Sequence, residues 1–145
     1  MGSIEDVILD RDRRGMTALR GHLAPEFCRE AAQFILERSG TALIGTGFYI
    51  LGTDAPETDG PPGAIALGRA LGALGYHVVY VSDGYTVPLL AAVAGREASV
   101  VEFPIADDAD SEAFARDLLE QLRPSLVIAV ERCGHTSNGA YLNMW

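Results

Sequence analysis

Four short apolar runs, separated by segments of helical pattern, constrain the fold more than any other feature of this sequence. Each run is continuously hydrophobic rather than alternating, which is typical of strands whose two faces are both covered by helices. Strands separated by helical segments favour βαβ units with right-handed crossovers, and therefore a parallel sheet. The predicted strands are residues 41–48, 77–82, 99–103 and 125–130.

Local signals set the limits of the helices between these strands. Gly75 and Gly95 suit the C-caps of the first two helices, and Pro124 follows the third. Within the first helix, Gly68 and Gly72 are four residues apart, so one face of that helix can lie close to the sheet. The predicted helices are residues 61–74, 86–94 and 111–122.

The first 40 residues precede this pattern and indicate two further helices. Ser3 can cap a short helix over residues 3–11, and Pro25 suits the first turn of a helix over residues 25–38. We therefore predict one α/β domain over residues 1–145, with N-terminal helices in 1–40 and strand–helix repeats in 41–145. The predicted architecture is a three-layer, Rossmann-like parallel sheet of about four strands, with helices on both faces.

Composition excludes several classes of function. The net charge of −9 argues against nucleic acid or an anionic membrane as a partner. All eleven basic residues are arginine, and the absence of lysine excludes a P-loop lysine, a Schiff-base lysine and a pyridoxal-phosphate site. Cys28 and Cys133 lie far apart without metal-binding spacing, as expected of reduced thiols. The predicted location is cytoplasmic, because the acidic N-terminus lacks a targeting pattern and no apolar run reaches the roughly 18 residues of a membrane span.

Polar residues follow the first and the fourth predicted strands. In a Rossmann-like order strand one is central, and strand four lies on its other side from strand two, so the switch point falls between the ends of strands one and four. The loop after strand one carries Asp54, Glu57 and Asp59, and strand four leads into Glu131 and Arg132. We therefore expect these two polar clusters to converge where a ligand binds.

Each cluster also has a structural interpretation that the sequence leaves open. Glu57 and Asp59 are equally typical of solvated loop acids. Glu131 and Arg132 are also typical of a structural ion pair, since burying a charge is costly unless it is paired or used. Residues 45–47 form Gly-Thr-Gly rather than a GxGxxG fingerprint, so a standard NAD site is not predicted.

With these motifs the chain resembles the C-terminal domain of the D-glutamate cyclase family. The resemblance lies within residues 41–144 and is carried by Thr46-Gly47-Phe48, the run ETDGPPGAIALGRAL at 57–71, Leu74-Gly75-Tyr76, Glu131-Arg132, Gly134, Asn138-Gly139, Tyr141 and Asn143-Met144. Tyr49, His135 and Asn138 depart from the family pattern, which has proline, arginine and aspartate there. Relatives are expected to continue beyond the position of Trp145, so we expect a truncated piece or a minimal member.

The resemblance implies a hydro-lyase of D-amino acid metabolism that converts D-glutamate into 5-oxo-D-proline and water. It implies that Asp59 or Glu131 moves the proton, and that Arg132 holds a substrate carboxylate. It also implies that the backbone N–H groups of Gly60, Gly63 and Ala64 steady the developing oxyanion. The implied substrate-binding residues are Thr46, Gly47, Glu57, Thr58, Gly60, Gly63, Ala64, Arg132 and Asn143.

The resemblance does not fix a cofactor. Glu57, Asp59 and Glu131 would repel a doubly anionic substrate unless a cation offsets their charge. A Mg²⁺ or Mn²⁺ ion held by these three carboxylates is therefore an alternative to a site without metal.

Two other functions stay open at this point. One is a noncatalytic module that binds a small ligand, such as an amino acid or a nucleotide. The other is an incomplete fragment that needs a partner domain, because missing C-terminal strands would leave a sheet edge unpaired. Larger relatives are expected to pair this domain with a separate hydro-lyase-like domain. The predicted partner is a small-molecule substrate, and a homo-oligomer is a further partner that the sequence leaves open.

Overall fold

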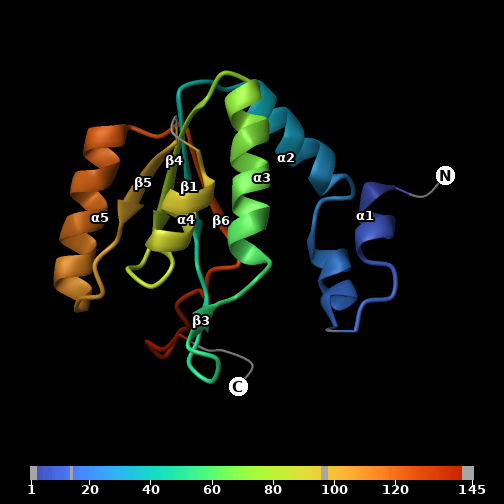
Figure 1. Cartoon of the computed structure of the whole chain (residues 1–145). Coiled ribbons are helices and arrows are strands. Elements are labelled where there is room, and N and C mark those ends of the chain that lie inside the picture. Colours follow the sequence, from blue (N-terminus) through green and yellow to red (C-terminus); the bar gives the residue numbers. More distant parts are fainter. Residues whose placement is uncertain (1–2, 14, 96–97, 142–145) are drawn as a thin grey trace. The chain divides into compact units, whose positions relative to one another are not determined.

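The structure, a computed structural model, describes residues 3–13, 15–95 and 98–141 (Figure 1). The chain divides into two compact units, Met1–Arg38 and Ser39–Trp145. This division lies close to the predicted border between the N-terminal helices and the strand–helix repeats. The prediction that residues 1–145 form one domain stays a prediction.

The larger unit is built on a four-stranded sheet whose order is β5-β4-β1-β6. All three strand pairs are parallel, and Ile44 in the middle of β1 is paired with Tyr80 on one side and Ile128 on the other. The predicted order, with the first strand central and the fourth strand beyond it, is confirmed. The strands are β1 (Thr41–Thr46), β4 (His77–Ser82), β5 (Ser99–Glu102) and β6 (Leu126–Val130).

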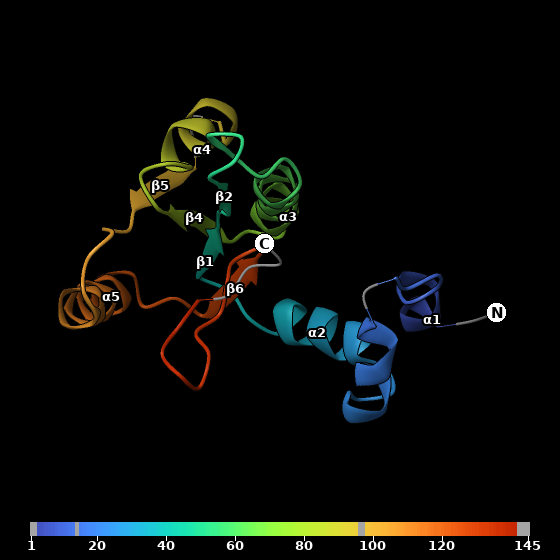
Figure 2. The same ribbon diagram turned by 90° about the horizontal axis from the view of Figure 1, so that it is seen from below.

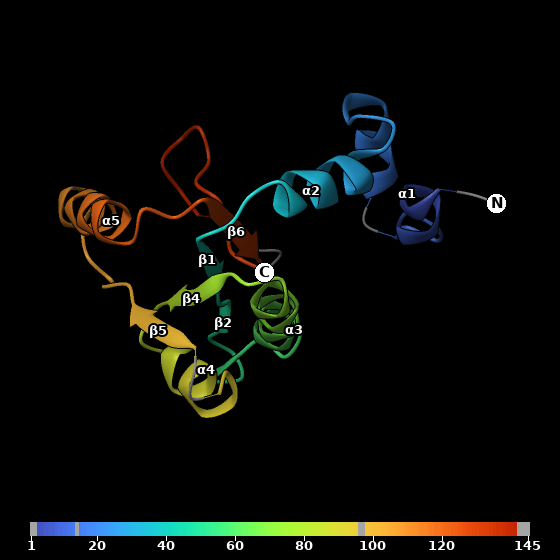
Figure 3. The same ribbon diagram turned by 90° about the horizontal axis from the view of Figure 1, so that it is seen from above.

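Helices cover both faces of this sheet. Figures 2 and 3 show α3 (Gly60–Ala73) and α4 (Val87–Val93) on one face and α5 (Asp108–Leu122) on the other. The N-cap of α5 is Asp107, whose carboxylate accepts the N–H of Asp110 at 3.0 Å. The predicted α/β fold with a three-layer, Rossmann-like parallel sheet is therefore confirmed.

The core of the larger unit lies on the two faces of β1 and β4. On one face Leu43, Val79 and Val81 are buried against Leu118 of α5. On the other face the buried side chain of Tyr80 reaches Gly68 of α3, where an added Cβ would overlap the tyrosine hydroxyl. The alternation of side chains along each strand thus gives one layer of contacts to α5 and one to α3.

The segment after β1 differs from the prediction. The strand was expected to continue to residue 48, but β1 ends at Thr46 because Gly47 has a φ of 121°, which residues with a side chain rarely adopt. The following loop contains a short antiparallel pair, β2 (Tyr49–Ile50) with β3 (Ala55–Pro56), that was not predicted. This hairpin leads the chain from the end of β1 to the start of α3.

The smaller unit contains α1 (Ile4–Ile8), the 3₁₀ helix η1 (Met16–His22) and α2 (Phe27–Leu36). The predicted cap is confirmed, since the Ser3 hydroxyl accepts the N–H of Asp6 and the Asp6 carboxylate accepts the N–H of Ser3. Both α1 and α2 are shorter than predicted, and η1 was not predicted. Glu5 joins the two α-helices, because its buried carboxylate accepts the N–H of Cys28 at 2.9 Å.

None of the helices in the described part of the chain combines the length and the apolar character that are needed to cross a membrane.

Candidate functional site

The candidate site is formed where β1 and β6 end and α3 begins. Because β1 and β6 are adjacent and parallel, the loops that follow them leave the same edge of the sheet. Figure 1 shows the loop after β1 leading from this edge to the start of α3. Thr46 is the last residue of β1, Glu131 follows β6 directly, and Gly60 is the first residue of α3. This edge is the place where open parallel sheets bind ligands.

Three carboxylates converge at this edge, and we call Glu57, Asp59 and Glu131 the acidic cluster. One carboxylate oxygen from each residue lies within 4.8 Å of the others. Glu57 is half-buried, and the other two side chains are exposed. Glu57 and Asp59 are therefore not independent loop acids, because the strand order brings Glu131 to them from more than 70 positions further along the chain.

The close approach of Glu131 depends on Gly60. A Cβ added to Gly60 would lie 2.6 Å from the Cβ of Glu131, which is closer than side-chain atoms approach one another. Glu131 itself has a φ of 47°, a left-handed conformation that is uncommon outside glycine. The backbone at the end of β6 is thus turned so that the glutamate side chain lies over the first turn of α3.

The N–H groups at the start of α3 are arranged differently from the prediction. Gly60 donates to the Asp59 carboxylate at 3.2 Å, and Gly63 donates to the Asp59 carbonyl at 3.0 Å. Pro61 and Pro62 have no N–H to offer. The N–H groups of Gly60 and Gly63 are thus already bonded to Asp59, and this geometry does not support their predicted role in steadying an oxyanion. Ala64, the third residue predicted for this role, is the fifth residue of α3.

Arg132 connects the ends of three strands. One of its terminal nitrogens donates to the Asp83 carboxylate at 2.6 Å and to the Gly47 carbonyl at 2.9 Å. Its other two guanidinium nitrogens carry no hydrogen bond within the described residues. Glu131 and Arg132 do not form the ion pair that the sequence left open, because Arg132 is paired with Asp83.

Asp83 is a site residue to which sequence reasoning gave no role. It follows β4 directly, its side chain is 11% exposed, and it also accepts the N–H of Tyr85 at 3.2 Å. The available signal was its position, since it is an acid at the end of the strand next to β1. The sequence does not show which of the eleven arginines would meet it.

Asp54, the third acid of the loop, is separate from the acidic cluster. Its carboxylate accepts a hydrogen bond from the Tyr49 hydroxyl, which together with partial burial raises the pKa of Tyr49. The Tyr49 ring is stacked on Tyr85 with 4.4 Å between the ring centroids. The hairpin is thereby joined to the loop after β4.

The remaining predicted site residues have varied surroundings. Thr46 and Gly47 are buried at the end of β1, whereas Thr58 is exposed next to the acidic cluster. Asn143 lies outside the described residues. His135, in the loop after β6, is exposed and forms an isolated β-bridge with Tyr141.

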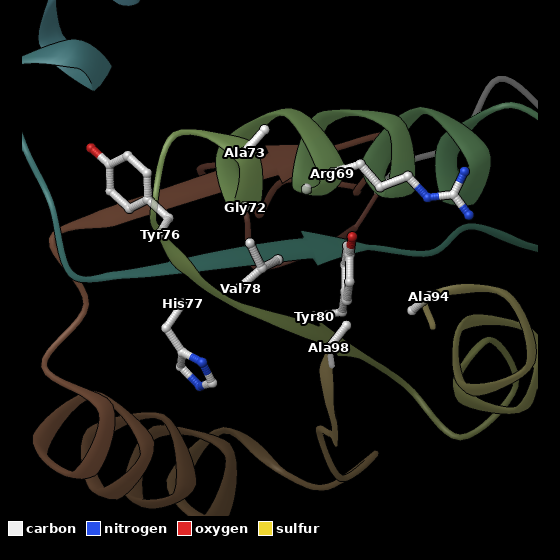
Figure 4. Close-up of a pocket in the computed structure, with 10 residues that line it drawn as sticks. Arg69, Gly72, Ala73, Tyr76, His77, Val78, Tyr80, Ala94 and Ala98 are labelled. Atoms are coloured by element: carbon white, nitrogen blue, oxygen red, sulfur yellow. The ribbon is translucent and has the colours of Figure 1, made fainter. Parts of the chain in front are cut away.

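A separate cavity of about 490 Å³ opens near the other end of β4 (Figure 4). Its lining includes Arg69 and Gly72 of α3 and His77 at the start of β4. The Tyr80 side chain points towards α3, and its hydroxyl donates a long hydrogen bond of 3.5 Å to the Ile65 carbonyl. Burial raises the pKa of Tyr80. The cavity shares no residue with the acidic cluster.

The fold and the residues at its edge together define an α/β domain with a parallel sheet and a charged candidate site at the carboxyl ends of its strands. A sequence model described as D-glutamate cyclase-like, C-terminal, matches residues 4–145. The chain therefore belongs to the D-glutamate cyclase-like family, as its C-terminal domain. No curated protein matches the chain.

Proposed function

We propose that this chain catalyses the cyclisation of D-glutamate to 5-oxo-D-proline and water. Family membership over residues 4–145 supports the reaction class. The observation that carries the proposal is the acidic cluster at the carboxyl edge of the sheet, followed directly in the chain by Arg132, of whose guanidinium one nitrogen is bonded to Asp83 and Gly47. Such a site offers both a proton acceptor and a carboxylate-binding group for an amino acid with two carboxylates.

The reaction requires two proton transfers around one bond exchange. The substrate ammonium loses one proton before its nitrogen attacks the γ-carboxyl carbon to form the C–N bond of the ring, and the nitrogen loses a second proton after the attack. The γ-carbon–oxygen bond breaks, and the departing oxygen takes up protons to leave as water. A carboxylate close to both the nitrogen and the leaving oxygen can carry both protons, one after the other, from the nitrogen to that oxygen.

Arg132 is suited to hold the substrate's α-carboxylate. The two guanidinium nitrogens that have no partner within the described residues can form a bidentate pair with a carboxylate, and such pairs are short and directional. Asp83 and the Gly47 carbonyl fix the third nitrogen, so the guanidinium plane is oriented before the substrate arrives. This preorganisation lowers the entropic cost of holding the substrate.

Glu131 is the better candidate for the proton-transfer residue. Asp59 already accepts the N–H of Gly60 as the N-cap of α3, so its carboxylate is engaged in holding the helix. Glu131 accepts no hydrogen bond within the described residues, and it precedes Arg132 directly in the chain. In this proposal the substrate held by Arg132 presents its amine to the Glu131 carboxylate.

Proton NMR of D-glutamate incubated with the purified chain tests the activity, with L-glutamate as the stereochemical control. We expect 5-oxoproline from the D-isomer alone. Glu131→Gln keeps the size of the side chain and removes the base, so turnover is expected to fall by about 100-fold or more. Glu120→Gln, which removes an exposed acid on α5, serves as the matched control and should leave turnover unchanged.

The same experiment separates this proposal from its rivals. Unchanged turnover in Glu131→Gln would remove Glu131 from the mechanism. A folded chain that binds D-glutamate without forming product would instead be a noncatalytic binding module. A folded chain that neither binds nor converts it would point to a site completed by another domain.

A further inference from the structure

The cavity at the start of β4 shares Arg69 of α3 with a second cavity, which is apolar. This second cavity has a volume of about 260 Å³ and lies between α3 and α4, where Ile65, Leu89 and Val93 contribute to its lining. The larger cavity, of about 490 Å³, has the size of a site for a small organic molecule. Together the two cavities place a guanidinium next to an apolar surface.

The surroundings of Arg69 lack negative charge. No aspartate or glutamate is among the described residues that line either cavity, although the chain has twenty acidic residues against eleven arginines. Arg69 forms no ion pair within the described part of the chain, and the hydrogen bond that it donates to the Val93 carbonyl is long, at 3.5 Å. Its guanidinium can therefore form a bidentate pair with an anion that enters the cavity.

The Tyr80 hydroxyl is the second polar group at this place. Tyr80 is 1% exposed, and within the described residues its hydroxyl forms only the long bond to the Ile65 carbonyl. Buried tyrosine hydroxyls normally have a partner, and O–H···O bonds are usually roughly 2.5–3.0 Å long. The hydroxyl lies against Gly68, the residue before Arg69, and Figure 4 shows the Arg69 side chain next to it. Burial raises the pKa of Tyr80, and the positive charge of Arg69 partly offsets this rise.

The larger cavity is open because much of its wall consists of residues with small side chains or none. Gly72 of α3 lines it on one side, and Ala94 and Ala98 line it on another (Figure 4). An added Cβ at Gly72 would meet nothing within 4 Å. A ligand can therefore enter next to Tyr80 without a shift of the core.

We propose that the two cavities form one binding site for a small organic anion, a carboxylate carried on an apolar or aromatic body. Arg69 pairs with the carboxylate, and the Tyr80 hydroxyl donates to it. The apolar body lies along Ile65, Leu89 and Val93, where it is removed from water. The site shares no residue with the acidic cluster, so it goes beyond the proposed function and does not depend on it.

The test is a titration of the full, ¹⁵N-labelled chain with 1-naphthoate, followed by ¹H–¹⁵N correlation NMR, which reports affinity and location together. We expect saturable binding with a Kd of about 1 mM or below, as is usual for a ligand of this size. The amide signals of Gly68, Gly72 and Ala98 should shift, whereas those of Gly60 and Glu131 should not. The neutral 1-naphthalenemethanol has the same ring system and should bind at least about fivefold more weakly, because it cannot pair with the guanidinium.

Three substitutions test the parts of the site. Arg69→Gln removes the charge and should weaken 1-naphthoate binding by at least about fivefold. Tyr80→Phe keeps the ring but removes the donor, so binding should weaken by roughly twofold to fivefold. Gly72→Leu fills the open space and should weaken binding by at least about tenfold, because the side chain and the ligand cannot occupy the same volume.

Arg116→Gln is the matched control. It removes an exposed arginine from α5, which covers the opposite face of the sheet, and binding within about twofold of the unmodified chain is expected. Circular dichroism of each variant shows that it is folded.

The absence of saturable 1-naphthoate binding by the folded chain would overturn the site. Equal affinity for 1-naphthoate and 1-naphthalenemethanol, or unchanged affinity in Arg69→Gln, would overturn its assignment to an anion. Shifts confined to the ends of β1 and β6 would place the probe at the acidic cluster and would also contradict the proposal. Because no glutamate is present, each of these results is distinct from a failure of the proposed reaction.

Discussion

Asp83 acts on the candidate site through Arg132 rather than by direct contact with the substrate. The 2.6 Å ion pair fixes one side of a guanidinium whose side chain is 42% exposed. Asp83→Asn keeps the acceptor oxygen for Tyr85 but removes the charge that orients Arg132. We expect KM for D-glutamate to rise about tenfold, equivalent to roughly 1.4 kcal/mol, with kcat changed by less than about threefold.

The stability effect of Asp83→Asn should be small because Arg132 is partly solvated. A loss of about 1 kcal/mol in the free energy of unfolding is expected, measured by urea titration. Asp117→Asn removes an exposed acid on α5 and provides the charge-matched control. A fall in kcat at constant KM would contradict a positioning role for Asp83 through Arg132.

Glu5 gives the smaller unit a defined pH dependence. Hydrogen bonds from its own N–H and from the N–H of Cys28 lower the pKa of its carboxyl from 4.5 to about 2. A lowered folded-state pKa means that the stabilisation is complete above pH 4.5 and is lost as the pH falls towards 2. The stability difference between the unmodified chain and Glu5→Gln should therefore shrink over this range.

Far-UV circular dichroism during acid titration measures this difference. Glu30→Gln, which removes an exposed acid in the first turn of α2, is the control. A stability difference that is the same at pH 2 and pH 6 would show that the Glu5 carboxylate does not stabilise the folded state through these bonds.

At the scale of elements, α3 carries two glycines that looked equivalent in the sequence. An added Cβ at Gly68 would overlap the Tyr80 ring and hydroxyl, whereas an added Cβ at Gly72 would meet nothing within 4 Å. Gly72→Ala should therefore raise the free energy of unfolding by about 0.5–1 kcal/mol through helix propensity. Gly68→Ala should lower it by about 1–3 kcal/mol, because the core must shift to accommodate the methyl group.

Urea unfolding of the two variants measures both effects against the same background. The substitutions are chemically identical and lie one turn apart, so propensity is matched and only the packing differs. Destabilisation by both substitutions would mean that Gly72 also needs to lack a side chain. Stabilisation by both would mean that Tyr80 can move away from α3.

The same element shows what the sequence could predict. The limits of α3 and the strand order follow from local signals, such as the prolines of its first turn and the continuous hydrophobicity of β1 and β4. That order was enough to predict that Glu131 meets Glu57 and Asp59. The sequence could not predict that Gly68 makes a close contact with the sheet and Gly72 does not, because this depends on which β4 side chain faces the helix.

Other features were missed for definite physical reasons. The strands β2 and β3 have two residues each, which is too short for a periodic pattern. The Asp83–Arg132 pair joins residues 49 positions apart, and sequence spacing does not select a partner at that distance. The N–H of Gly60, which was predicted to bind the substrate, instead donates to the Asp59 carboxylate and caps α3.

At the scale of the whole molecule, the buried apolar side chains are unevenly distributed. Within the described residues they all lie between Ala42 and Leu126. In the smaller unit, by contrast, large apolar side chains such as Val7, Ile8 and Leu36 are exposed. The hydrophobic contribution to folding is therefore concentrated in the unit Ser39–Trp145, since it scales with the apolar area removed from water.

We expect residues 39–145 to fold cooperatively when residues 1–38 are deleted. All five tyrosines lie in this unit, so near-UV circular dichroism of tyrosine reports on its packing alone in both the full and the shortened chain. The shortened chain should show a single urea transition with an m-value of roughly 1–2 kcal/mol per M, as expected for a unit of this size. Loss of the tyrosine signal, or a transition without cooperativity, would show that the N-terminal helices complete the core. That result would also explain why the family match begins at residue 4 rather than at the first strand.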